Sequence, residues 1–77
     1  MENAITDVLL HVDEQLDALA RGRLEDGVRH QDGVVSAGFS GKNPHMMMVL
    51  FDSDRIRGTD ILHQVQAQGL HAELIGL

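Results

Sequence analysis

Four segments of the chain read as β-strands, and in residues 4–12 and 70–77 apolar and polar residues alternate with the period of two typical of strands with one buried face. In the first segment, residues 4–12, this period puts Thr6, Val8, Leu10 and Val12 on one side. The other three segments are residues 34–40, 45–52 and 70–77. We therefore predict four strands.

Two further segments carry apolar residues at helical spacing. In the first they are Leu16, Leu19, Ala20, Leu24 and Val28, which form one stripe on a helix. We expect this helix to begin at Asp13, whose side chain would cap it, with Glu14 favourable at the positive end of the helix dipole. It should end by Gly33, a residue that commonly terminates helices.

The second helix is predicted to start at a threonine cap and to stop at a glycine. Thr59 is the expected cap, and Gly69 supplies the left-handed conformation that ends the helix. The residues expected to face inward are Ile61, Leu62 and Val65. The complete order is then strand, helix, strand, strand, helix, strand.

This order predicts a single α+β domain over residues 1–77, a ferredoxin-like βαββαβ sandwich. Residues 41–44 join the second and third strands into a hairpin, so the four-stranded sheet is antiparallel with two helices on one face. Right-handed crossovers give the spatial order fourth, first, third, second strand. The first and third strands are expected to be neighbours.

Residues 33–77, GVVSAGFSGKNPHMMMVLFDSDRIRGTDILHQVQAQGLHAELIGL, resemble the last two-thirds of a heavy-metal-associated domain, the fold of copper chaperones. The matching pieces are Gly33-Val34, the strand end Val49–Asp52, and the stretch Gly69–Leu74. The first strand and helix match more weakly, so the resemblance spans nearly the whole chain. It implies a ferredoxin-like fold and a role in handling metal.

The chain departs from this family at the loop where the family binds metal. There the family carries a Met-x-Cys-x-x-Cys motif, whereas residues 11–17 of this chain read HVDEQLD. The first helix is also predicted to be several residues longer than in the family. Transfer of monovalent copper through paired thiolates, which the resemblance would imply, is impossible without cysteine.

Composition narrows the possible partners. Acidic residues outnumber basic ones 12 to 6, giving a net charge of −6 that would repel nucleic acid and anionic membrane surfaces. The absence of cysteine excludes disulfides and thiolate metal sites. The first ten residues carry acids where an export signal is basic, and no apolar run approaches about 20 residues, so we expect a cytoplasmic protein.

The predicted topology brings several metal-ligating side chains to one edge of the sheet. The first strand ends there, the first helix begins there, and the third and fourth strands start there. The candidate ligands at this edge are His11, Asp13, Glu14, His45 and His71. Imidazole and carboxylate ligands suit zinc, divalent copper, nickel or non-haem iron, so a divalent metal ion is the expected cofactor.

A purely structural alternative remains open at this edge. Asp13 is explained as a helix cap and Glu14 as a dipole partner, and histidines at strand ends are often solvated. Counting by twos also puts His11 and His71 on the open face but His45 on the helix side, so shared coordination requires a local twist. Consecutive residues 46–48, all methionine, alternate between faces, and packing explains them better than thioether ligation.

The face of the sheet opposite the helices is predicted to be apolar. Its outward residues are Leu9, Met46, Met48, Leu50 and Ile75. Such a face favours a homodimer or another protein partner, although scattered single exposed residues would need no partner. Because no catalytic motif is present, the sequence favours a non-enzymatic domain that binds metal or, alternatively, an interaction module that has lost the metal.

Overall fold

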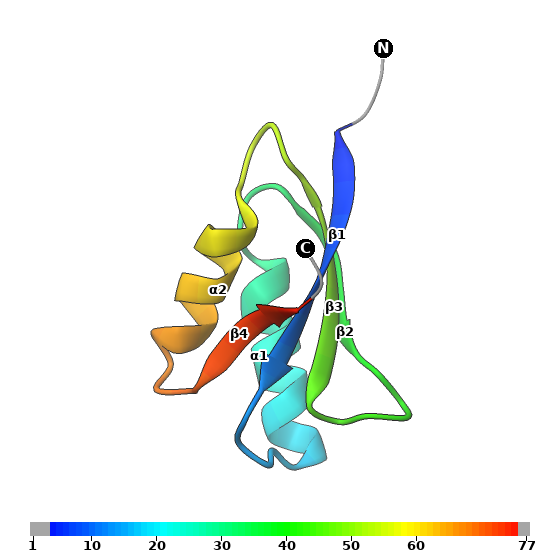
Figure 1. Cartoon of the computed structure of the whole chain (residues 1–77), viewed down its shortest axis with the longest axis vertical. Helices are drawn as coiled ribbons and strands as arrows, with labels where there is room; N and C mark the ends of the chain where they lie inside the picture. Colours follow the sequence, from blue (N-terminus) through cyan, green and yellow to red (C-terminus); the bar gives the residue numbers. More distant parts are fainter. Residues whose placement is uncertain (1–3, 76–77) are drawn as a thin grey trace.

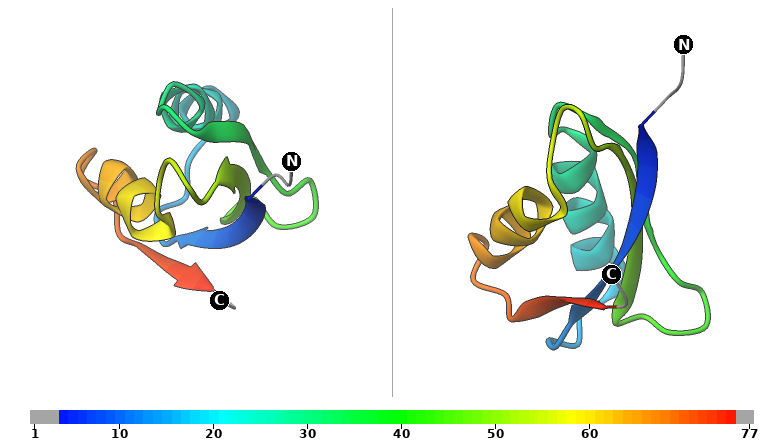
Figure 2. Two further views of the ribbon diagram at one scale, coloured as in Figure 1. Left: turned by 90° about the horizontal axis from the view of Figure 1, so that it is seen from above. Right: turned by 45° about the horizontal axis from the view of Figure 1, so that its top comes forward.

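A computed structural model describes residues 4–75 and confirms the predicted fold (Figure 1). Its elements are β1 (Ile5–Val12), α1 (Ala18–Arg29), β2 (Val34–Phe39), β3 (Met46–Asp52), α2 (Gly58–Gln66) and β4 (Ala72–Ile75). The sheet has the order β2-β3-β1-β4 with antiparallel pairs, as predicted. Figure 2 shows both helices on the same side of this sheet. Neither helix in residues 4–75 is long and apolar enough to cross a membrane.

The first helix starts later than the sequence predicts. It begins at Ala18, and Asp17 caps it by accepting a hydrogen bond from the Ala20 backbone N–H at 2.8 Å. Asp13 lies well before this start and does not cap the helix; its backbone N–H donates to the His71 carbonyl at 2.8 Å. This bond, with a similar bond from Val12, keeps the chain in the extended path of β1. Residues 13–17 therefore form a loop, and the predicted longer helix is wrong.

The second helix starts slightly earlier than predicted. Its cap is Arg57, whose backbone N–H donates to the Asp60 carboxylate at 3.0 Å, so Thr59 is already helical. Gly69 has a φ of 85°, as its predicted role in ending the helix requires. The last strand pairs with β1 from Val12↔Ala72 to Leu9↔Ile75. Residues 76–77, which we had included in that strand, lie outside the described part of the chain.

The core lies between the sheet and the helices and contains the inward side chains of every element except β4. Its buried residues are Val8, Leu10, Val12, Leu24, Val28, Ala37, Met47, Val49, Phe51, Ile61 and Val65. Two predicted core residues are exposed: Thr6, near the outer end of β1, and Leu19, which is 64% exposed. Leu19 is about 140° around the helix from Leu24, so both cannot face the sheet.

Gly33 connects α1 to β2 in a conformation that other residues rarely adopt. Its φ is 99°, and an added Cβ would lie 2.9 Å from Ile56 Cγ2. We expect Gly33→Ala to lower the free energy of unfolding by more than about 1 kcal/mol, measured by urea denaturation. The matched control is Gly22→Ala on the helix, where an added methyl meets nothing within 4 Å and should stabilise by about 0.5–1 kcal/mol. Equal effects of the two substitutions would contradict this explanation.

Candidate metal centre

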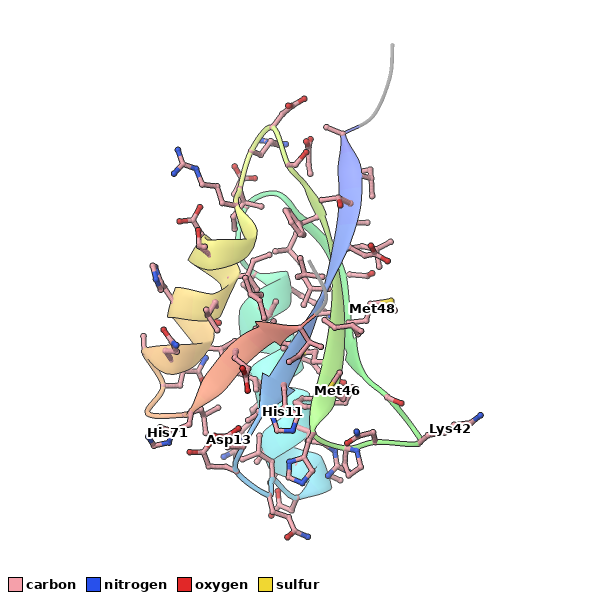
Figure 3. The ribbon with its side chains drawn as sticks, viewed as in Figure 1. His11, Asp13, Lys42, Met46, Met48 and His71 are labelled. Carbon is pink, nitrogen blue, oxygen red and sulfur yellow. The ribbon has the colours of Figure 1, made fainter. Side chains whose placement is uncertain are left out.

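One end of the sheet collects the polar side chains that the sequence predicts to converge. The end of β1, the loop of residues 13–17 and the starts of β3 and β4 meet there (Figure 3). The predicted ligands at this end are His11, Asp13, Glu14, His45 and His71. We call this region the histidine pole. The structure divides it into three arrangements.

The first arrangement joins β1, the loop and β4. His11 Nδ1 lies 3.1 Å from Asp13 Oδ1, and His11 pairs in register with Glu73 of β4. One ligand atom from each of His11, Asp13 and Glu73 can be chosen so that all lie within 4.8 Å of one another. His11 is half-buried, and the two acids are exposed. Such spacing allows one small cation to contact all three side chains.

Sequence reasoning missed Glu73. A usable signal was present, since Glu73 lies two residues after His71 and β4 is the predicted neighbour of β1. Side chains two apart on a strand share a face, which puts Glu73 on the open face with His11.

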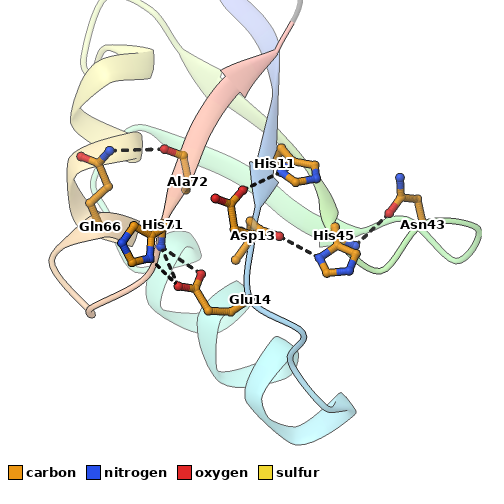
Figure 4. Close-up of polar contacts among 9 residues, drawn as sticks. His11, Asp13, Glu14, Asn43, His45, Gln66, His71 and Ala72 are labelled. Atoms are coloured by element: carbon orange, nitrogen blue, oxygen red, sulfur yellow. Dashed lines mark hydrogen bonds and ion pairs between the residues drawn. The ribbon is translucent and has the colours of Figure 1, made fainter.

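The second arrangement is a pair of stacked imidazoles. The ring of His45 lies 5.7 Å from the ring of His11 between centroids, with 17° between the planes. His45 Nδ1 donates to the Val12 carbonyl at 2.8 Å, because a carbonyl can only accept (Figure 4). The neutral ring then carries its free lone pair on Nε2, the form in which imidazole binds metal.

The sequence predicts that His45 points to the helix side of the sheet, away from His11, but the structure does not require this. His45 lies in the turn before β3, which begins at Met46, so the alternation of strand side chains does not apply to it. Its backbone N–H donates to Asn43 Oδ1 at 3.0 Å, which fixes the turn. The ring can therefore reach His11 although Met47 points into the core.

The third arrangement is an ion pair between Glu14 and His71. Glu14 Oε2 lies 2.7 Å from His71 Nδ1, and the carboxylate also accepts the His71 backbone N–H at 2.9 and 3.1 Å (Figure 4). Because α1 begins at Ala18, Glu14 does not act at the helix dipole. Its role in the structure is to tie the loop to the chain entering β4.

The Glu14–His71 pair predicts a pH dependence. The hydrogen bond to His71 lowers the pKa of Glu14 below 4.5, and the bond to Glu14 raises the pKa of His71 above 6.5. The contribution of Glu14 to stability is present above pH 4.5 and is lost as the pH falls through its lowered pKa. The contribution of His71 is present below pH 6.5 and is lost as the pH rises through its raised pKa. The pair is therefore most stabilising between these two values.

An NMR titration of the histidine rings measures this effect. We expect His71 to titrate above the ordinary histidine range and to return to it in Glu14→Gln, which removes the negative charge. The ring of His63, exposed on α2, is the internal reference in both spectra. An unchanged His71 titration in the variant would show that the ion pair does not form in solution.

Comparisons with known proteins agree on the architecture. No protein-family profile matches this sequence, and no curated protein matches it. Among solved structures, it is similar to oxidized MerP from Ralstonia metallidurans, with a TM-score of 0.83 and 14% identity, covering 95% of this chain and 100% of that one. It is also similar to a copper binding domain from HMA7, a P-type ATPase (TM-score 0.82, 20% identity, 91% and 93% covered).

A third similar structure is the copper chaperone of Enterococcus hirae in its apo form. The TM-score is 0.79 and the identity 24%, with 88% of this chain and 98% of that chain covered. At these identities the likeness concerns the backbone and not the metal ligands. This chain has the ferredoxin-like fold of heavy-metal-associated domains, and it contains no cysteine.

Proposed function

We propose that this chain is a non-enzymatic domain that binds a borderline divalent metal ion at the histidine pole. His11, Asp13 and Glu73 are the proposed core of the site, with His45 beside them as a further ligand. The observation that carries this proposal is the approach of the three core ligand atoms to within 4.8 Å of one another. The net charge of −6 would raise the local concentration of cations.

The ligand chemistry decides which ions suit this site. The names of two structural neighbours mention copper, and such proteins share the fold of this chain. Monovalent copper held by paired thiolates does not fit here, because the chain has no cysteine. Nitrogen and oxygen ligands favour zinc, divalent copper, nickel or non-haem iron. We therefore infer that the fold is used for a different ion or a different binding mode.

In this proposal, Glu14 and His71 support the site but do not contact the ion. Their mutual contact at 2.7 Å engages His71 Nδ1 and Glu14 Oε2. By fixing the loop against β4, they hold Asp13 near Glu73. Contacts of this kind, one shell removed from the ion, commonly support the geometry of metal sites.

The direct test is a titration of metal-free protein, purified without a metal-affinity resin, with Zn²⁺, Cu²⁺ and Ni²⁺ at neutral pH. Calorimetry should show saturable binding of one ion per chain for at least one metal. NMR should show the rings of His11 and His45 shifting with that ion, while His63 on α2 stays unchanged. The absence of saturable binding for all three ions would refute the proposed function.

A second candidate function, pairing with another copy of the chain, is favoured by the open face of the sheet. Its apolar residues are Leu9, Met46, Met48, Leu50 and Ile75. Met48 is the most exposed of them at 45%, and a hollow of about 520 Å³ lies beside it. Apolar patches of this kind are often buried in interfaces.

The substitution Met48→Glu tests this second function. If the face pairs two copies, a buried carboxylate would disrupt the interface, and sedimentation should show the variant shifted from dimer to monomer. Val35→Glu is the matched control, because Val35 is 59% exposed on the edge strand β2 and outside this set of residues. A wild-type protein that is already monomeric at high concentration would rule out the homodimer.

A further inference from the structure

Two methionines lie on the same face of the sheet as His11. Met46 and Met48 point to the open face, whereas Met47 between them is completely buried in the core. In the β1–β3 register, Met46 is directly opposite His11, and Met48 is opposite Leu9 (Figure 3). Side chains opposed in this way have Cβ atoms about 4.5–5.5 Å apart. The Met46 thioether is therefore within reach of the His11 ring.

The ring of His11 has two chemically different sides. Its Nδ1 faces Asp13, whose carboxylate accepts a hydrogen bond from that nitrogen. In the neutral ring, the free lone pair is then on Nε2. Figure 4 shows Asp13 on the β4 side of the His11 ring, and the strand order puts Met46 of β3 on the other side of β1. The carboxylates of Asp13 and Glu73 therefore lie on the β4 side of His11, and Met46 lies on the β3 side.

The surface beside the methionines leaves their sulfur atoms room to move. The hollow of about 520 Å³ is lined by Met46, Met48, Phe39 and Asn43, among others. Gly38, opposite Met48 in the sheet, has no side chain to fill it. Methionine has three rotatable bonds, so a sulfur atom can turn toward an ion without a change in the backbone.

We propose that His11 Nε2 and Met46 Sδ form a binding site for a soft monovalent ion of the Ag⁺ or Cu⁺ type on the open face of the sheet. Thioether sulfur favours soft ions, and imidazole accepts them. Asp13 then orients His11 through Nδ1 without touching the ion, a common arrangement for metal-binding histidines. This inference rests on the proposed function in one respect: both sites use His11.

Sharing His11 makes the two sites mutually exclusive, because a neutral imidazole offers one lone pair. A divalent ion would take Nδ1 together with Asp13 and Glu73, and a soft ion would take Nε2 together with Met46. Met46 therefore determines whether the pole accepts soft ions, and Glu73 contributes to its affinity for divalent ones. The two substitutions should affect different metals.

The experiment uses Ag⁺, which has no redox chemistry under the conditions of the measurement, and protein labelled with ¹³C at the methionine methyl groups. We expect Ag⁺ to shift the Met46 methyl signal and to leave the Met47 signal in place. Met46→Leu should weaken Ag⁺ binding by roughly tenfold or more while changing Zn²⁺ binding less than about twofold. Met47→Leu is the matched control, since it removes a buried thioether and should leave Ag⁺ binding unchanged.

Glu73→Gln provides the reciprocal variant. It should weaken Zn²⁺ binding and leave Ag⁺ binding unchanged, which distinguishes failure of the proposed function from failure of this inference. If the wild-type protein binds no Zn²⁺ but its Met46 methyl signal responds to Ag⁺, the divalent site is refuted and the soft-ion site is supported. An unshifted Met46 methyl signal, or unchanged Ag⁺ affinity in Met46→Leu, would overturn the soft-ion site.

Discussion

His11→Ala is expected to weaken zinc binding by more than about 100-fold, the upper end of what loss of a supporting residue around a metal costs. The reason is the central position of His11. It contacts Asp13 at 3.1 Å, pairs with Glu73 in the sheet and stacks on His45. Without this ring, the two carboxylates keep no nitrogen ligand between them. Calorimetric titration of wild type and variant with Zn²⁺ measures the change.

The matched control for this prediction is His63→Ala, which removes an exposed imidazole on α2. Zinc affinity should be unchanged in this variant, so histidine content alone would not explain the result. Circular dichroism should show that His11→Ala stays folded, because His11 is outside the buried core. Equal zinc affinity in the two variants would place the binding site elsewhere.

Leu10→Ala is expected to lower the free energy of unfolding by about 2–5 kcal/mol. Leu10 is fully buried at the centre of β1, between its partners Met47 on β3 and Leu74 on β4. Shortening it leaves a cavity that the surrounding side chains fill incompletely. The total stability of small domains is about 5–15 kcal/mol, so the loss is a large share of it. Urea denaturation followed by circular dichroism measures both proteins.

Leu19→Ala makes the same chemical change at an exposed position. Leu19 is 64% exposed at the start of α1, so its truncation should change the free energy of unfolding by less than about 0.5 kcal/mol. The comparison also tests the assignment of the helix face, since the sequence pattern places Leu19 in the core. Equal losses for the two leucines would contradict the orientation of α1.

The strand order could be predicted because it follows from the local sequence pattern of each strand and from the right-handedness of crossover connections. The alternation in residues 5–12 and the apolar run of residues 46–51 identify two strands, and the handedness of crossovers then orders the strands in the sheet. The start of α1 could not be predicted in the same way. Asp13 and Asp17 are both good capping residues, and local sequence does not choose between them. The choice is made by backbone bonds to His45 and His71, which are distant in sequence.

The location of the histidine pole follows from topology, but its internal contacts do not. Knowing which strand ends meet is enough to bring His11, His45 and His71 to one end. The pairing of Glu14 with His71 depends on the path of the loop, which the sequence predicted to be helical. Side-chain alternation alone puts Glu73 on the open face with His11, but the structure is needed to show that these two residues are directly opposite each other.

The β1–β4 pairing joins His11, near the beginning of the chain, to Glu73, near its end. An ion held by both residues would act as a cross-link closing a loop that contains almost the entire sequence. Cross-links around long loops restrict the unfolded chain most strongly. Metal loading would then slow unfolding and protect the domain from proteases, so its lifetime would depend on metal supply.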